Sequence, residues 1–90
     1  MPEKTGQRLV LMDGTTIENG ACGYADGVLW CWVHGYTMQE AAGIFFDPHK
    51  TGRIVYEYGE MADTYVGYTI CVNIFTDESG QVSIGLRKEA

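Results

Sequence analysis

Cysteine and histidine are the residue types in this sequence that could act as nucleophiles or bind a metal ion. Eight residues separate Cys22 from Cys31, fourteen separate His34 from His49, and Cys71 is distant from all of them. A zinc site needs cysteines and histidines at close, paired spacing, so the sequence predicts no metal site. Cys22 and His34 could still pair in space as a nucleophile and its base, but only their residue types support this alternative. We therefore predict no catalytic residue, no cofactor and no enzymatic activity.

Two other patterns associated with chemistry are incomplete. The segment 46–52, Phe-Asp-Pro-His-Lys-Thr-Gly, resembles a phosphate-binding loop, but His49 stands where that loop needs a glycine directly before the lysine. Carboxylates that could serve acid–base chemistry or hold calcium gather at two predicted turns, at Glu57, Glu60, Asp63, Asp77 and Glu78. The spacing of a calcium-binding loop is absent, and acidic residues at strand ends are commonly solvated. A surface that mimics nucleic-acid phosphates is the alternative for these carboxylates.

Aromatic residues are the strongest candidates for binding. Trp30, Trp32 and His34 project to the same side of a predicted strand, and Tyr24 and Tyr36 flank that strand in predicted loops. Aromatic faces stack nucleobases and anchor protein partners, so these five residues are the predicted ligand- or partner-binding residues. For the two tryptophans, however, the favoured interpretation is that they build the hydrophobic core.

The strand that carries the tryptophans is apolar on both faces. Side chains alternate across a strand, so Val28, Trp30 and Trp32 face one way while Leu29, Cys31 and Val33 face the other. Neither set is polar. Such a strand needs cover on both sides, from the chain itself or from a partner.

The remaining pattern predicts one helix among short strands. Thr37 and Glu40 form a capping box, apolar residues follow at helical spacing, and Pro48 ends the helix, which predicts a helix over 38–46. Alternation and turn residues predict a loop over 21–27 and strands over 8–12, 16–17, 28–34, 53–58, 64–76 and 82–86, with a bulge or bend at Gly67. The order β-β-β-α-β-β-β predicts an α+β fold, a mainly antiparallel curled sheet with the helix packed on one face. We expect a single domain over 1–90, with flexible ends at 1–7 and 87–90.

The widths of these elements predict self-association. Five or six strands at ~4.8 Å spacing form a sheet roughly 24 Å wide, whereas one helix is only ~10 Å across. Curling can hide one face of the sheet but not both. We therefore expect a homo-oligomer in which a second copy covers the exposed face.

Composition restricts the partners and the compartment. The chain of 90 residues has a net charge of −6, which disfavours nonspecific binding to nucleic acid or to anionic lipid. The N-terminus has no apolar segment of a secretory signal, and no apolar run approaches the ~20 residues that span a bilayer. Three cysteines are too few for a disulfide-stapled scaffold. We expect a protein of the host-cell cytoplasm with reduced thiols; a virion component assembled there would have the same composition.

Several segments carry a resemblance to other proteins. They are Leu-Val-Leu-Met-Asp-Gly-Thr at 9–15, Glu-Ala-Ala-Gly-Ile-Phe-Phe-Asp-Pro-His-Lys-Thr at 40–51, Gly-Tyr-Thr at 67–69 and Val-Ser-Ile-Gly-Leu-Arg-Lys at 82–88. On these segments the chain resembles a loose group of small acidic proteins encoded by phages and prophages. The resemblance implies a phage context but implies no particular activity and no site residue.

Two functional hypotheses follow for a small phage-encoded binding module. In the first, the protein antagonises bacterial anti-phage defence, either by blocking an effector protein or by sequestering a nucleotide signal between aromatic side chains at a subunit interface. In the second, it is a minor tail or virion-assembly protein whose partners are other structural proteins.

Overall fold

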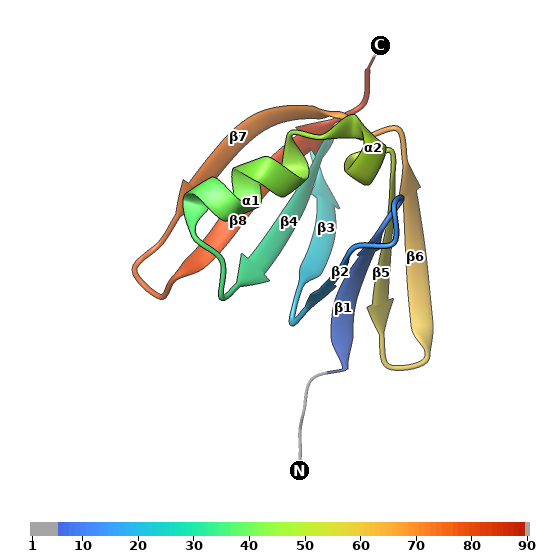
Figure 1. Cartoon of the computed structure of the whole chain (residues 1–90). Helices are drawn as coiled ribbons and strands as arrows, with labels where there is room; N and C mark the ends of the chain where they lie inside the picture. The colour runs from blue at the N-terminus through green and yellow to red at the C-terminus, as the bar shows by residue number, and fades with distance from the viewer. Residues whose placement is uncertain (1–5, 90) are drawn as a thin grey trace.

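The computed structural model describes residues 6–89, which form eight strands and two short helices. The strands make two antiparallel, four-stranded sheets that curl into one structure (Figure 1). The first sheet has the order β2-β1-β5-β6, with β1 Gln7–Leu11, β2 Thr16–Glu18, β5 Arg53–Tyr58 and β6 Met61–Val66. The second has the order β3-β4-β8-β7, with β3 Ala21–Ala25, β4 Val28–His34, β7 Ile70–Thr76 and β8 Gln81–Arg87. The predicted α+β fold with a curled antiparallel sheet is confirmed.

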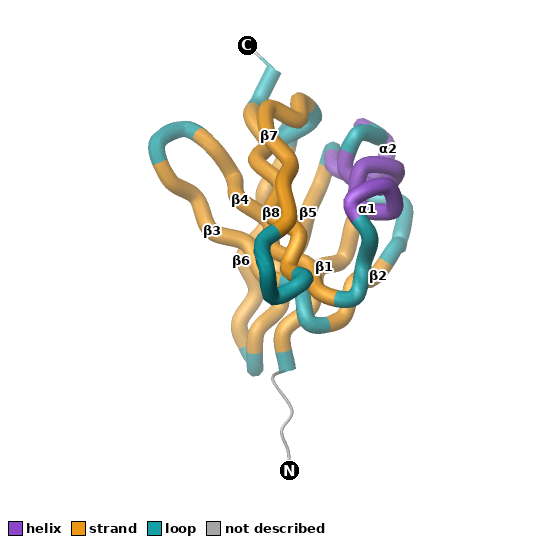
Figure 2. Tube along the Cα trace, turned by 90° about the vertical axis from the view of Figure 1, so that its left-hand side faces the viewer, coloured by secondary structure: helices purple, strands orange, loops and turns teal. Residues whose placement is uncertain are grey.

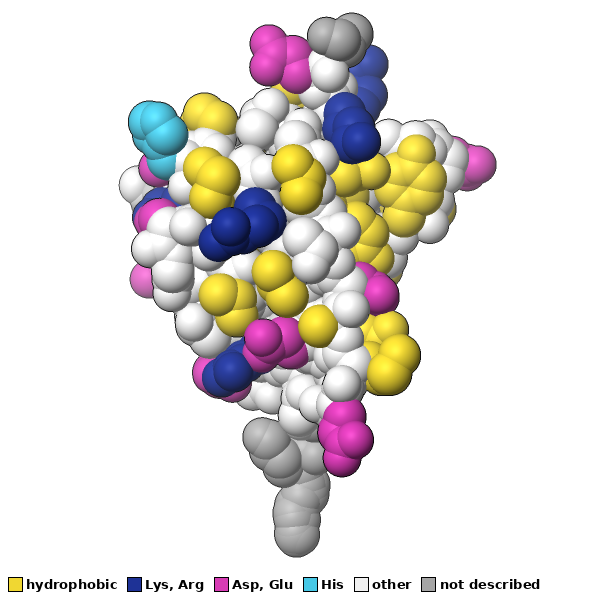
Figure 3. Space-filling view, turned by 90° about the vertical axis from the view of Figure 1, so that its right-hand side faces the viewer, with side chains coloured by type: hydrophobic (Ala, Val, Ile, Leu, Met, Phe, Trp, Pro, Cys, Tyr) yellow, Lys and Arg dark blue, Asp and Glu magenta, His cyan; other side chains and the backbone are white. Residues whose placement is uncertain are grey.

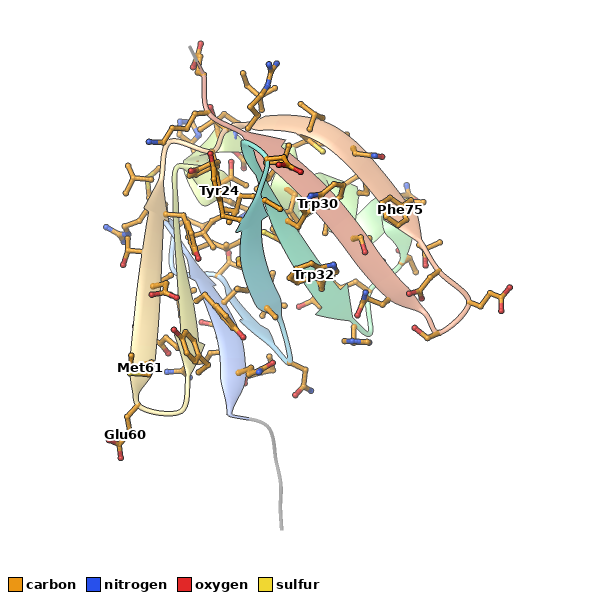
Figure 4. The ribbon with its side chains drawn as sticks, turned by 180° about the vertical axis from the view of Figure 1, so that it is seen from behind. Tyr24, Trp30, Trp32, Glu60, Met61 and Phe75 are labelled. Atoms are coloured by element: carbon orange, nitrogen blue, oxygen red, sulfur yellow. The ribbon has the colours of Figure 1, made fainter. Side chains whose placement is uncertain are left out.

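The core lies between the sheets. Alternating side chains of β1, β4 and β8 are fully buried there together with Ile54 of β5, and helix α1 (Met38–Phe45) adds Ala41 and Phe45 to the same cluster. Figure 2 shows α1 and α2 (Pro48–Thr51) together on one side of the strands. The opposite, outer face of the second sheet has no helix over it within residues 6–89 (Figure 4).

The predicted capping box is present at the start of α1. The Thr37 hydroxyl oxygen accepts a hydrogen bond from the Glu40 backbone N–H at 3.0 Å, and a Glu40 carboxylate oxygen accepts one from the Thr37 N–H at 2.9 Å. Two backbone donors at the helix N-terminus are thereby satisfied.

The predicted loop over 21–27 is wrong, because most of it is strand β3. Asp26 and Gly27 both have positive φ angles, of 53° and 81°, and lie between the paired residues Ala25 and Val28. This conformation is a two-residue type I′ turn, which suits the twist of a hairpin and which an Asp-Gly dipeptide favours. The Asp-Gly dipeptide at 26–27 was the available sequence signal.

The predicted long strand over 64–76 is divided between the two sheets. β6 ends at Val66, and the chain then passes through Gly67, whose φ is +89° and whose N–H donates to the Gly52 carbonyl oxygen at 2.9 Å. The predicted bend at Gly67 is therefore a complete crossing from one sheet to the other.

Two further boundaries differ from the prediction. Pro48 begins the short helix α2 as well as ending α1, because the Asp47 carboxylate accepts from the His49 N–H at 3.0 Å and caps the new turn. Gln7 and Arg87, expected in flexible ends, belong to strands β1 and β8. The rest of the predicted N-terminal flexible end, residues 1–5, and residue 90 lie outside the described residues.

Candidate functional site

The two tryptophans lie on the outer face of the second sheet. On β4, Leu29, Cys31 and Val33 are completely buried between the sheets. Trp30 and Trp32 point the other way and are half-buried, and Figure 4 shows them on the face opposite the helices. The favoured interpretation, that the tryptophans build the core, is therefore wrong.

Glycines on the neighbouring strands seat the tryptophan rings. A Cβ atom added to Gly23 would lie 3.1 Å from the Trp32 ring, and one added to Gly85 would lie 3.1 Å from the Trp30 ring. Both rings therefore rest directly on the backbone of a neighbouring strand. Phe75 of β7 meets Trp30 edge to face with 6.0 Å between ring centroids and is 44% exposed. We call Trp30, Trp32 and Phe75 the aromatic face.

A pocket of about 410 Å³ lies at one end of this face. Small-molecule sites in proteins typically have volumes of roughly 300–1,000 Å³, so its size suits a small ligand. Trp32 and His34 form part of its wall, and we call it the Trp32 pocket; the other lining residues are Gln7, Asn19, Ala21 and Gln81.

Three carboxamides from separate elements give the Trp32 pocket its polar character. Gln7 begins β1, Asn19 stands in the turn between β2 and β3, and Gln81 begins β8. Each carboxamide can both donate and accept hydrogen bonds, and no carboxylate, lysine or arginine is among these lining residues. The pocket therefore places carboxamide residues beside an indole ring.

Local hydrogen bonds fix the backbone that carries the three carboxamide residues. Asn19 adopts a φ of 59°, and its backbone N–H donates to the Gln7 carbonyl oxygen at 3.0 Å. The Asp77 carboxylate accepts from the Ser79 hydroxyl at 2.7 Å and from the Gln81 backbone N–H at 3.2 Å. These bonds, chiefly that of the Ser79 hydroxyl, lower the pKa of Asp77. The turn that leads into Gln81 is thus internally tied.

The structure brings together three of the five predicted binding residues. Trp32 and His34 line the pocket, and Trp30 lies beside it on the aromatic face. Tyr24 belongs to β3 rather than to a loop and packs edge to face on Tyr68, with 6.2 Å between ring centroids. Tyr36 does lie in the connection before α1, but it packs half-buried against the core.

Sequence reasoning missed the carboxamides and Phe75. Gln7, Asn19 and Gln81 come from three distant parts of the chain, and no spacing pattern connects them. The turn dipeptide Asn19-Gly20 was visible, but it indicates a bend rather than a binding group.

The residues considered for catalysis have structural partners or no common site. Cys22 points into the core while His34 is on the outer face, so they do not form a nucleophile and base. Of the acidic groups, Glu57 binds Arg8 at 2.6 Å, and Asp63 accepts from the Tyr58 hydroxyl at 2.9 Å. Within residues 6–89 no group of three or more His, Cys, Asp or Glu side chains is placed to hold a metal ion.

Neither helix in the described part of the chain has the length and apolar character needed to cross a bilayer. Comparisons with protein-family models, with curated proteins and with solved structures gave no match. The candidate site therefore depends on the geometry of this chain, and no residue role is carried over from a relative.

Proposed function

We propose that this protein is a non-enzymatic binding module that holds the base of a nucleotide in the Trp32 pocket. The observation that carries the proposal is the combination of one indole wall with three carboxamides in a pocket of about 410 Å³. An indole face stacks on any nucleobase, and a carboxamide matches the paired donor and acceptor on a base edge.

The charge of the site favours the base over the phosphates as the recognised part. No lysine or arginine is among the lining residues of the Trp32 pocket, and the whole chain has a net charge of −6. The phosphates of a bound nucleotide would therefore point to solvent, where repulsion is screened.

A nucleotide-binding module suits the phage context that the resemblance implies. We infer that the protein acts in the host cytoplasm as an antagonist of anti-phage defence by sequestering a nucleotide signal. In a homo-oligomer, a second copy packed on the aromatic face would lie next to the Trp32 pocket and could shield the bound base from water.

Tryptophan fluorescence and calorimetry test the binding step. Trp30→Phe leaves Trp32 as the reporter, and titration with cyclic dinucleotides, ADP-ribose and single nucleosides should quench it saturably. Trp32→Leu should weaken binding by about 5- to 150-fold, since base–aromatic stacking contributes about 1–3 kcal/mol. Gln81→Leu should also weaken binding, because it removes one polar partner. If none of these ligands gives a saturable calorimetric signal, the proposal is contradicted.

A different surface supports the second candidate function, a minor tail or virion-assembly role. β6 is an edge strand of the first sheet, and its Met61 and Val66 are 61% and 58% exposed. Figure 3 shows this side of the molecule, where apolar side chains reach the surface between charged ones. An open strand edge can pair with a strand of another protein. Co-purification with virions, without binding of any nucleotide, would favour this role.

A further inference from the structure

Cys22 and Cys31, which eight residues separate in the sequence, lie face to face in the core. Cys22 of β3 and Cys31 of β4 are directly opposite each other, and their sulfur atoms are 3.4 Å apart. Both are free thiols. The third cysteine, Cys71, is on β7, paired opposite Leu86 of β8.

The hairpin register places this pair where a disulfide can form. The two-residue turn at 26–27 makes Ala25 and Val28 the first hydrogen-bonded pair, and pairs then alternate along the hairpin. Cys22 and Cys31 are consequently a non-hydrogen-bonded pair, in which Cα atoms are about 4.5 Å apart. That separation lies within the range of about 4.4–6.8 Å that disulfides adopt, so bridging needs only rotation of the side chains.

The two thiols differ in their access to solvent. Cys22 is 8% exposed on an edge strand, whereas Cys31 is completely buried. The hydrogen bond with Cys22, together with burial, raises the pKa of the Cys31 thiol well above its usual value. Cys31 therefore keeps its proton, and Cys22 is the sulfur that an oxidant meets first.

We propose that Cys22 and Cys31 form a reversible dithiol–disulfide site whose oxidant is a small peroxide. Cys22 as thiolate attacks one oxygen of hydrogen peroxide, the O–O bond breaks, and after protonation the products are a sulfenic acid and one water. The Cys31 sulfur then attacks the Cys22 sulfur; the S–O bond breaks, the S–S bond forms, and the hydroxyl leaves with the Cys31 proton as a second water. The two thiols lose two electrons, and peroxide gains them.

Oxidation would act on the strands that carry the candidate binding site. Cys22 lies between Ala21 and Gly23, and Cys31 lies between Trp30 and Trp32, so the sulfur pair is on the reverse side of these strands from the tryptophan rings. A disulfide would fix the distance between β3, whose Gly23 seats the Trp32 ring, and β4, which carries Trp32. This inference does not depend on which ligand, if any, the pocket binds.

The test is thiol mapping of the full chain before and after peroxide treatment. The reduced protein, freed of reductant, is treated with hydrogen peroxide, denatured, alkylated and cleaved with trypsin. Cleavage after Arg8, Lys50, Arg53 and Arg87 puts Cys22 and Cys31 in fragment 9–50 and Cys71 in fragment 54–87. We expect three alkylated thiols before treatment. After treatment, fragment 9–50 should carry no alkyl group, and its mass should be that of the reduced, unalkylated fragment less two hydrogen atoms. Dithiothreitol should restore both alkylation sites.

Variants separate this site from general oxidation. Cys71→Ser should oxidise as the parent does, whereas Cys31→Ser should leave Cys22 as a sulfenic acid that dimedone traps. Circular dichroism checks whether each variant is folded. If a variant does not fold, the thiol mapping of the parent chain still tests the proposal. Oxidation of Cys71 while fragment 9–50 keeps both alkylated thiols would overturn the proposal. So would a bridge from Cys71 to either residue, or a bridge only between chains.

Discussion

Thr37→Ala tests whether the capping box contributes to stability as its geometry implies. The substitution removes the hydroxyl oxygen that accepts from the Glu40 N–H at 3.0 Å, but it leaves the Thr37 N–H that donates to the Glu40 carboxylate at 2.9 Å. One of the two bonds is lost. An N-cap replacement by alanine costs about 1 kcal/mol. The fold should persist, because Ala41 and Phe45 keep α1 packed in the core.

This free energy is measurable by denaturation. With an m value of about 1 kcal/mol per molar urea for a small chain, the midpoint should fall by about 1 M. The melting temperature should fall by about 4–8 °C for a domain of this size. Circular dichroism and the fluorescence of Trp30 and Trp32 both follow the transition.

Thr37→Ser is the matched control, since serine keeps the accepting oxygen and is at least as good an N-cap residue. Its midpoint should stay near that of the parent chain. Equal midpoints for Thr37→Ala, Thr37→Ser and the parent would refute the reasoning. A loss of folded signal in Thr37→Ala without denaturant would also refute it, because the packing of α1 would then depend on the cap.

Three further predictions concern charge, helix propensity and assembly. Lys50 binds Asp13 at 2.6 Å and holds the pKa of that carboxyl below its ordinary value. The stabilisation from this ion pair should be complete above about pH 4 and decline as the pH falls further. The urea midpoint of Asp13→Asn should therefore depend less on pH in the acid range than the midpoint of the parent chain, and an equal dependence would contradict this. Gly43→Ala, whose Cβ meets nothing within 4 Å, should raise the free energy of unfolding by about 0.5–1 kcal/mol, and a lower midpoint would count against it. Light scattering at micromolar concentration should find a dimer or larger assembly of the 10.0 kDa chain, and a monomer would remove the case for a shared interface.

Local signals in the sequence were sufficient for the fold class and for the helix start. Thr37 and Glu40 act on backbone groups within one turn, so their interaction needs no knowledge of the rest of the chain. Alternation likewise placed Trp30, Trp32 and His34 on one side of their strand, because side-chain direction follows from the strand period alone. Both features depend only on residues that are neighbours in sequence.

Tertiary structure alone decided which face of β4 is buried and which groups share a site. Both faces are apolar, so composition could not distinguish Leu29, Cys31 and Val33 from the tryptophans; packing against α1 and the first sheet did so. The pairing of Cys22 with Cys31 is the exception, because it follows from the Asp-Gly turn at 26–27, a local signal that the prediction of a loop over 21–27 overlooked. The carboxamides of the Trp32 pocket meet because sheet pairing and chain reversals bring distant segments together. The contacts among these carboxamides arise from the geometry of the whole chain, and residue spacing carries no record of them.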